Sequence, residues 1–252
     1  MENNFIDQDY DAYTAEDHLV WQELNRRQSA MDQRRISKEY LNGVELLQLR
    51  ESRIPHIATL SEKLSGYTGW SLVPVKGLIP AEDFFNLIID KRYPVTTVIR
   101  KANEIDFSEQ PDIFHDILGH LPLLINKRFS DWLIAYSKIA IRYVGNERAV
   151  ELLARLYWYT YEMGLIVEEQ EVKVYGGAII TSANELDNVW DSEVPKHAFN
   201  TDFVFRTPYN PFKLQNEYFV INDFTSLYDS LASLENRLRH HLSQVAHNQV
   251  GV

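Results

Sequence analysis

The chain has 252 residues, 45% of them hydrophobic and 24% charged, with a formal net charge of −11 and no cysteine. The lack of cysteine excludes disulfides and thiolate metal sites, and the acidic balance argues against a nucleic-acid or anionic-lipid partner. Neither a secretory signal, an interdomain linker nor an apolar stretch of membrane-spanning length is visible, so we expect one cytoplasmic domain over 1–252, with flexible ends at 1–10 and 245–252, acting on a small molecule.

The first hundred residues carry mostly helical signals. Thr14 followed by Asp17 is typical of an N-cap with an acidic first turn. The segment 71–79 is extended or loop-like, and the β-branched run at 93–100 predicts a strand. Apolar residues recur at helical spacing elsewhere in this half, which predicts helices at about 14–28, 36–49, 55–64 and from 80 onward.

The second half is also predicted to be largely helical. A short strand is expected at 172–175, and 176–225 mixes turns with short elements. Helical periodicity predicts helices at about 111–118, 129–144, 147–164 and 225–244. The fold class expected from these patterns is mainly α with a few short β-strands.

Two histidines stand out in the apolar sequence PDIFHDILGHLPLL. His115 and His120 are five residues apart, and on an unbroken α-helix that spacing would place them roughly 140° apart. Gly119 is a natural residue to end the helix and Pro122 opposes its continuation, so we expect His115 on the last turn and His120 just beyond it. The two rings could then face one metal ion. The alternative is that both are ordinary histidines satisfied by the backbone.

A carboxylate is available as a third ligand. Glu162 is the one acid in an apolar and aromatic helical run, and the residues three and four positions before it are Tyr159 and Trp158. A solvent-facing glutamate usually has polar neighbours there, so a functional role is favoured over an exposed one. Two histidines and one carboxylate leave coordination positions open, an arrangement suited to Fe(II) and O2 chemistry.

At these residues the chain resembles the pterin-dependent aromatic amino acid hydroxylases, and most of all their short single-domain bacterial phenylalanine hydroxylases. The similarity lies in PDIFHDILGHLPLL, WYTYEMGLI and KVYGGAIITSANEL, with further blocks in the same order over most of residues 10–230. It implies the single-domain catalytic fold of that family. It also implies Fe(II), a tetrahydropterin co-substrate and O2, and hydroxylation of an aromatic amino acid ring, first of all L-phenylalanine to tyrosine.

The resemblance also assigns roles to particular residues. It gives the iron to His115, His120 and Glu162. It gives the amino acid carboxylate to Arg100, and the rest of the substrate pocket to Pro111, Trp158, Met163, Ala178, Thr181 and Ser182. It gives the pterin a stacking partner in Phe84, and further contacts in Gly77, Leu78, Ile79, Asp116, Ala154 and Tyr157. Taken without the resemblance, Phe84 would be read as core packing. For Arg100 the alternative is a surface salt bridge, but a guanidinium just after a strand fits substrate anchoring better.

Three positions depart from the family pattern. The family usually has Glu where this chain has Asp116, Phe where it has Met163, and Gly where it has Ala178. The last two positions face the substrate ring in the family, so the pocket that orients the ring has a different shape. Hydroxylation of phenylalanine at the meta carbon, or of tryptophan, is therefore an alternative to formation of tyrosine.

Two other kinds of protein remain as alternatives. A metal-dependent hydrolase could use the same three ligands with zinc, although no glutamate is placed as the base of a zinc-hydrolase helix. A non-catalytic binding module could have kept the fold, although such a module would be expected to lose a ligand. With no room for the regulatory domain or the tetramerisation tail of long animal enzymes, we expect a monomer.

Overall fold

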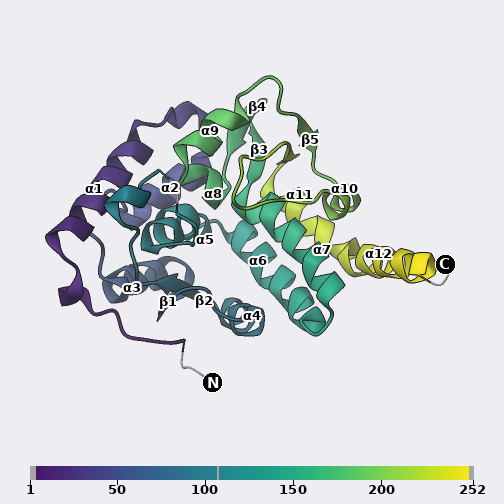
Figure 1. Cartoon of the computed structure of the whole chain (residues 1–252), viewed down its shortest axis with the longest axis horizontal. Coiled ribbons are helices and arrows are strands. Elements are labelled where there is room, and N and C mark those ends of the chain that lie inside the picture. Colours follow the sequence, from purple (N-terminus) through teal and green to yellow (C-terminus); the bar gives the residue numbers. More distant parts are fainter. Residues whose placement is uncertain (1–3, 107, 250–252) are drawn as a thin grey trace.

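The computed structural model of the chain describes residues 4–106 and 108–249, with side chains up to 244. Helices dominate and the strands are short, which confirms the mainly α fold class (Figure 1). Within the described residues, no helix is both long and apolar enough to cross a lipid bilayer. The α-helices are α1 (Ala15–Ala30), α2 (Lys38–Leu47), α3 (Ile57–Thr68), α4 (Ala81–Ile89), α5 (Leu121–Leu124), α6 (Lys127–Ala140), α7 (Glu147–Tyr157), α8 (Gly177–Ile180), α9 (Ala183–Val189), α10 (Thr201–Arg206), α11 (Phe224–Asp229) and α12 (Leu234–Gln249).

The strands form two small sheets. In the first, β1 (Ser71–Val75) and β2 (Arg92–Thr96) pair in parallel, with α4 as the crossover between them. In the second the strand order is β4-β3-β6-β5, where β3 is antiparallel to β4 and parallel to β6. Its strands are β3 (Gly164–Glu168), β4 (Glu171–Val174), β5 (Lys196–Ala198) and β6 (Tyr218–Ile221).

The predictions for the first hundred residues are confirmed to within a few residues. α1 begins after Thr14, whose hydroxyl accepts from the Asp17 backbone while the Asp17 carboxylate accepts from the Thr14 backbone, a complete capping box. α3 is capped at its C-terminus by Gly69, which adopts the left-handed conformation with φ 74°. The predicted strand at 93–100 is β2, and it ends earlier, at Thr96.

Two features of the second half outside the histidine segment were not predicted. The helix predicted at 147–164 ends two residues early, at Glu162, and the apolar residues after it form the unpredicted strand β3, which pairs with β4 and with β6 from far along the chain. The helix predicted at 225–244 is divided into α11 and α12 by a 3-10 turn at Ser230–Ser233. Both differences arise from tertiary packing, which helical periodicity in the sequence does not predict.

One expectation at the histidines is wrong. The helix does not end at Gly119, which has no left-handed φ, and the chain runs from 113 to 124 as one helix whose middle, His115–His120, is π-helical. A π-helix bonds residue i to i+5, so its turn is longer than an α-turn and residues five apart come to the same face. The spacing of the two histidines is therefore satisfied within the helix, without a break.

A second π-helical segment, Trp158–Glu162, ends the helix that begins with α7. It carries Glu162 as its last residue, and β3 begins two residues later. The segments that carry both histidines and the carboxylate are thus both π-helical. Such segments are rare and occur frequently at functional sites.

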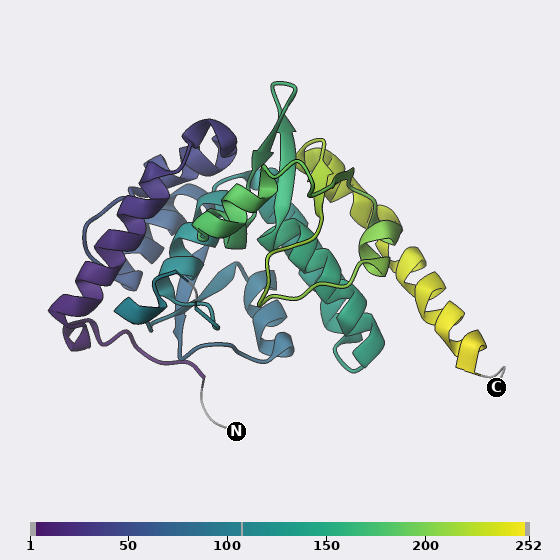
Figure 2. The ribbon, with the colours of Figure 1, turned by 45° about the horizontal axis from the view of Figure 1, so that its top comes forward.

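One large hydrophobic core links most of these elements, and a second, small cluster of Val73, Val75 and Leu87 joins β1 to α4. The largest fully buried side chains of the large core include Trp21 of α1, Trp132 of α6, and Trp70, which precedes β1. The Trp70 indole N–H donates to Ser130 Oγ at 2.7 Å, so the buried polar atom of the ring is satisfied. In both ribbon views α1 and α12 lie at opposite sides of the molecule, with α6 and α7 between them (Figures 1 and 2).

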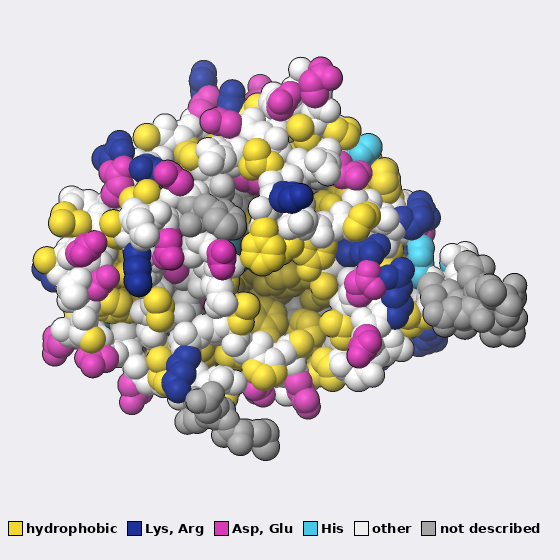
Figure 3. Space-filling view, viewed as in Figure 1, with side chains coloured by type: hydrophobic (Ala, Val, Ile, Leu, Met, Phe, Trp, Pro, Cys, Tyr) yellow, Lys and Arg dark blue, Asp and Glu magenta, His cyan; other side chains and the backbone are white. Residues whose placement is uncertain are grey.

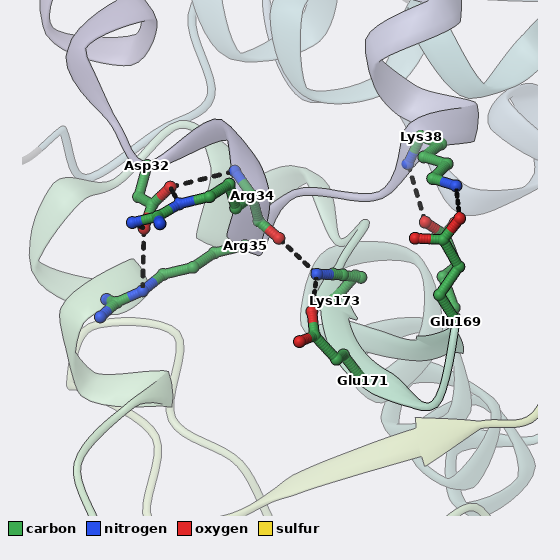
Figure 4. A network of polar contacts seen from close by, with 8 residues as sticks. Asp32, Arg34, Arg35, Lys38, Glu169, Glu171 and Lys173 are labelled. Carbon is green, nitrogen blue, oxygen red and sulfur yellow. Dashed lines mark hydrogen bonds and ion pairs between the residues drawn. The ribbon is translucent and has the colours of Figure 1, made fainter.

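A polar network fastens the segment before α2 to the β3–β4 hairpin, which projects at the top of Figure 2. Glu168 accepts from the Ser37 hydroxyl at 2.6 Å and from the Lys38 backbone N–H at 2.9 Å, and so caps α2 from another part of the chain. Lys173 Nζ donates to the Arg34 carbonyl at 2.6 Å (Figure 4). The network ties the strand that follows Glu162 to the N-terminal third of the fold.

Each of the two predicted flexible ends belongs only in part to the described residues. Residues 4–6, within the predicted flexible end, run antiparallel to β1, where Ile6 N–H donates to the Pro74 carbonyl and Asn4 accepts from Lys76 N–H. At the other end of the chain, the backbone of helix α12 continues to Gln249. Positions 1–3 and 250–252 of the predicted flexible ends lie outside the described residues.

Candidate metal centre and its two-lobed cavity

The two π-helical segments bring three side chains to one point. His115 Nε2 lies 2.9 Å from His120 Nε2, and the Glu162 carboxylate oxygens lie 3.6 Å from the first and 3.4 Å from the second. One ligand atom can be chosen from each residue so that the three atoms lie within 4.8 Å of one another. No other such group of three occurs among the described residues. The histidines outside this group whose side chains are described lie elsewhere, for example His197, which is 3.1 Å from Glu217.

Thr181 determines which nitrogen of His115 faces the cluster. The Thr181 hydroxyl donates its one hydrogen to the Gly177 carbonyl at 2.8 Å, so it accepts from His115 Nδ1–H at 3.0 Å. The lone pair of His115 is then on Nε2, directed at the other two side chains. Burial, and then the neighbouring His120, lower the pKa of His115 to about 4, so the ring is neutral, as a metal ligand must be.

His120 is held by close packing from two neighbours. Its ring stacks on Tyr161, with centroids 4.3 Å apart and planes 9° from parallel. On another side the backbone of Gly177 approaches so closely that a Cβ there would lie 2.5 Å from His120 Cε1. Gly177 also approaches Gly119, where a Cβ would be 3.1 Å from the Gly177 carbonyl oxygen. The two glycines therefore let α8 pack against the π-helix.

The cluster fits a divalent metal ion. Glu162 Oε2 is buried without a hydrogen bond to any described residue, which is costly for a carboxylate unless a cation or another donor is present. Burial opposes ionisation of Glu162, but the two imidazoles hold the pKa of its carboxyl below the ordinary value. Two neutral nitrogens and one carboxylate oxygen, without a thiolate, are the donors of an iron(II) site that leaves room for other ligands.

A cavity of about 340 Å³ opens on one side of the cluster, and we call it the cofactor lobe. It is lined by every residue that the family resemblance assigns to the pterin: Gly77, Leu78, Ile79, Phe84, Asp116, Ala154 and Tyr157. The Phe84 ring lies perpendicular to the Tyr157 ring, with centroids 5.9 Å apart, and both rings line the lobe. Figure 3 shows a hollow lined by hydrophobic side chains in the middle of this face of the molecule.

A second cavity of about 510 Å³, which we call the substrate lobe, borders the same cluster. It is lined by every residue assigned to the amino acid: Arg100, Pro111, Trp158, Met163, Ala178, Thr181 and Ser182. Ser182 also caps α9 by accepting from the Glu185 backbone N–H at 3.3 Å. The two lobes share His115 and Glu162, so their contents would meet at the metal cluster, and they also share Leu78, Pro111, Tyr157, Trp158 and Tyr209.

Arg100 is buried in the substrate lobe and already has a partner. Its Nε and Nη2 donate to the two carboxylate oxygens of Asp112 at 2.7 and 2.9 Å, and Asp112 also accepts from the Arg100 backbone at 3.0 Å. Burial opposes ionisation of Asp112, yet the contacts with Arg100 hold its pKa below the ordinary value. The edge formed by Nη1 and the second hydrogen of Nη2 remains for a carboxylate, which can bind end-on.

Asp116 lies in the cofactor lobe, one residue from His115. Its Oδ2 accepts from the Thr96 backbone N–H at 2.8 Å, and burial raises the pKa of Asp116 to about 7. The carboxyl is thus fixed to the end of β2 rather than pointing freely into the lobe. The side chain is one methylene shorter than the glutamate usual in the family, and it reaches the backbone N–H of Thr96.

Three residues of the site were missed by the sequence reasoning. Asp112 orients Arg100, Tyr209 lines both lobes, and Gln215 contacts Trp158. Asp112 could have been suspected, because an acid in the apolar run between Pro111 and Leu118 needs a partner. Nothing in the local sequence signals the other two, which lie in a loop far along the chain.

Comparisons with known proteins agree with this geometry. Residues 9–251 match the family described as biopterin-dependent aromatic amino acid hydroxylase. Phenylalanine-4-hydroxylase of Chromobacterium violaceum is 39% identical over 234 residues, covering 91% of this chain and 78% of the relative, and that of Caulobacter vibrioides is 37% identical, covering 92% and 82%. The C. violaceum crystal structure with bound iron(III) and 7,8-dihydrobiopterin matches with a TM-score of 0.90 and 38% identity, covering 96% of this chain and 87% of that one. This chain therefore belongs to the biopterin-dependent aromatic amino acid hydroxylases.

Proposed function

We propose that this chain is a monooxygenase that uses iron(II), a tetrahydropterin and O2 to hydroxylate the ring of L-phenylalanine at C4, giving tyrosine. The observation that carries the proposal is the two-lobed cavity whose halves meet at His115 and Glu162. The relatives named phenylalanine-4-hydroxylase, and the C. violaceum structure that holds iron and a biopterin, support the same reaction.

The metal would be held by His115, His120 and Glu162, and the pterin by the cofactor lobe. Phe84 would stack on the pterin ring, and the backbone of the loop Gly77–Ile79 would meet its edge. When bound, the iron and the reduced pterin activate O2 for transfer of one oxygen atom to the substrate. No side chain is needed as a nucleophile, so the work of the protein is positioning and exclusion of water.

The amino acid would lie in the substrate lobe with its carboxylate on Arg100. The fixed contact with Asp112 orients the guanidinium, so its remaining donors face the lobe before substrate arrives. Trp158, Met163 and Ala178 would then bound the ring, and the carbon that they present to the metal cluster is the one hydroxylated. The residues around the ring thereby decide between tyrosine and its meta isomer.

The test is product analysis. The purified chain, supplied with Fe(II), tetrahydrobiopterin and O2, is incubated with phenylalanine, tyrosine or tryptophan, and the ortho-, meta- and para-tyrosine products are separated by chromatography. Para-tyrosine from phenylalanine, formed with pterin oxidation, is expected. Mainly meta-tyrosine, or turnover of tryptophan alone, would overturn the choice of substrate or carbon, and hydrolytic activity with zinc would overturn the reaction class.

The remaining parts of the proposal concern the whole chain. We infer one catalytic domain, acting as a cytoplasmic monomer on a small molecule and without a nucleic-acid partner. The net charge of −11 and the scattered basic residues support the last point. Light scattering coupled to size-exclusion chromatography should give a mass near 29.5 kDa. Twice that mass would contradict the monomer.

A further inference from the structure

Trp158, which lines both lobes beside the metal cluster, has one polar atom, and that atom is bound. Its indole N–H donates to Gln215 Oε1 at 3.0 Å. Gln215 is 5% exposed and lies in the loop between α10 and β6, far from Trp158 in sequence. An indole in a cavity wall can rotate about two side-chain bonds, and a hydrogen bond at its edge restricts that rotation.

The orientation of the Gln215 amide is determined by its own contacts. Its Nε2 donates to the Asn210 carbonyl at 2.9 Å and to the Lys213 carbonyl at 2.8 Å, which uses both amide hydrogens. The oxygen must therefore face Trp158. The Gln215 backbone is anchored as well, because its N–H donates to Glu185 Oε1 at 3.1 Å and its carbonyl accepts from Asn188 at 2.8 Å.

The same loop covers Trp158 from the other side. The Tyr209 ring stacks on the indole, with centroids 4.7 Å apart and planes 17° from parallel. The start of the loop is held where the Pro208 carbonyl accepts from the Tyr159 hydroxyl at 3.0 Å. Trp158 is thus restrained at its face by Tyr209 and at its edge by Gln215, and of the two only Gln215 distinguishes the two flipped orientations of the indole about Cβ–Cγ, because it binds the N–H.

We propose that Gln215 is a positioning residue which, through the indole N–H of Trp158, sets where the substrate ring lies relative to the metal cluster. This inference rests on the proposed function, because it requires an aromatic ring in the substrate lobe. Loss of the contact lets the indole move, and a shift of about 1 Å at a reacting ring can change both rate and the carbon attacked. The pterin should be less affected than the substrate, because Trp158 is not among the residues assigned to it, although Trp158 also lines the cofactor lobe.

Three variants separate this role from simple support of the loop. Gln215→Met keeps the side-chain volume but removes all three hydrogen bonds, whereas Gln215→Glu retains an acceptor for the indole and loses both donors to the loop carbonyls. Trp158→Phe removes the N–H and keeps a ring. Gln33→Met is the matched control: Gln33 also ties a loop, donating to the Met31 carbonyl at 3.0 Å, but lines neither lobe.

We expect Gln215→Met to lower kcat/KM for phenylalanine about tenfold, to raise the share of ortho- and meta-tyrosine, and to leave the pterin KM within twofold. Gln215→Glu should keep the wild-type product distribution while melting at a lower temperature. In the Trp158→Phe background, Gln215→Met should change kcat/KM by less than twofold, because the two substitutions remove the same contact. Gln33→Met should affect melting alone.

Several results would overturn the inference. Wild-type products and kcat/KM in Gln215→Met would do so, as would equal loss in Gln215→Met and Gln215→Glu, or independent, multiplying effects of Gln215→Met and Trp158→Phe. If Gln215→Met does not fold, Gln215→Glu and Trp158→Phe still test the inference, because only Trp158→Phe should then alter the products. A wild type that makes no hydroxylated phenylalanine would instead refute the proposed function.

Discussion

The two lobes of the cavity are built differently. The cofactor lobe is walled largely by helices and strands, with side chains such as Tyr93 and Tyr136 that are 3% and 1% exposed. The substrate lobe is walled in part by loops, and its rim includes Phe212 and Leu214, which are 61% and 51% exposed. A lobe set in the core suits a co-substrate that stays the same. A lobe walled by loops can accept substitutions that change which ligand it binds without disturbing the fold.

The departures from the family pattern follow the same division. Met163 and Ala178, which change the shape around a ring, both line the substrate lobe. The one departure in the cofactor lobe, Asp116, remains a carboxylate and is fixed by a backbone hydrogen bond. Substitutions on each side should therefore affect one ligand and spare the other, except where the lobes meet.

The largest effect is expected at that meeting point. Glu162→Gln replaces the anionic ligand of the cluster with a neutral amide, so iron binding should weaken and turnover should fall at least about 100-fold with either ligand varied. Metal content by mass spectrometry and tyrosine formation by chromatography measure the two effects, and thermal melting checks that the protein is folded. A variant with full iron content and wild-type turnover would show that Glu162 is not a ligand.

Arg100→Lys should affect the substrate lobe alone. Lysine keeps the charge but can neither bind Asp112 through two donors nor present a planar edge to a carboxylate, so kcat/KM for phenylalanine should fall roughly 10–100-fold, about 1.4–2.7 kcal/mol. The pterin KM should barely change. Steady-state kinetics with each ligand varied makes the comparison, and equal losses for both would mean that Arg100 serves the fold.

Phe84→Leu is the reciprocal change in the cofactor lobe. It removes an aromatic face while keeping an apolar side chain, so about 0.5–1.5 kcal/mol of stacking should be lost, and the pterin KM should rise roughly two- to tenfold. The amino acid KM should stay constant. If the amino acid KM rises as much as that of the pterin, the two lobes are not energetically separate.

The smallest change in rate is expected from Met163→Phe combined with Ala178→Gly. These substitutions restore the residues usual in the family, so the product ratio should move toward para-tyrosine, by about fivefold or less for a change near 1 kcal/mol, or stay there if para already dominates. Chromatography of the three tyrosine isomers gives the ratio. A wild type making mainly meta product, unmoved in the double variant, would remove these residues from control of the attacked carbon.

The sequence was sufficient for what depends on local pattern or on motifs. The N-cap at Thr14, the helix after Pro80 and the mainly α fold class were predicted correctly. The strand β3 was not predicted, although its run GLIVE begins at Gly164 and is followed closely by the predicted strand at 172–175, with which it forms the β3–β4 hairpin. A short apolar run is compatible with a helix or a strand, and the pairing of β3 with both β4 and β6 decides between them.

The site shows the same limit. The motifs predicted residues that the structure brings together around one cavity, but the reason the two histidines meet was wrong, because a π-helical turn has no signature in α-helical periodicity. The orientation of Arg100 by Asp112, and that of Trp158 by Gln215, depends on which hydrogen bonds form in three dimensions. Those contacts join segments whose proximity only the fold determines.

The π-helical segment at His115–His120 also bears on which insertions and deletions this gene can tolerate. A π-turn holds one residue more than the α-turn it replaces, so deleting a single residue between the histidines would restore ordinary helical bonding. It would also rotate the helical residues after the deletion about the helix axis. One of them is Pro122, which packs so closely on Gly43 that a Cβ placed on Gly43 would lie 2.1 Å from the Pro122 carbonyl oxygen. The number of residues between the two histidines should therefore be under as strong a selection as the histidines themselves.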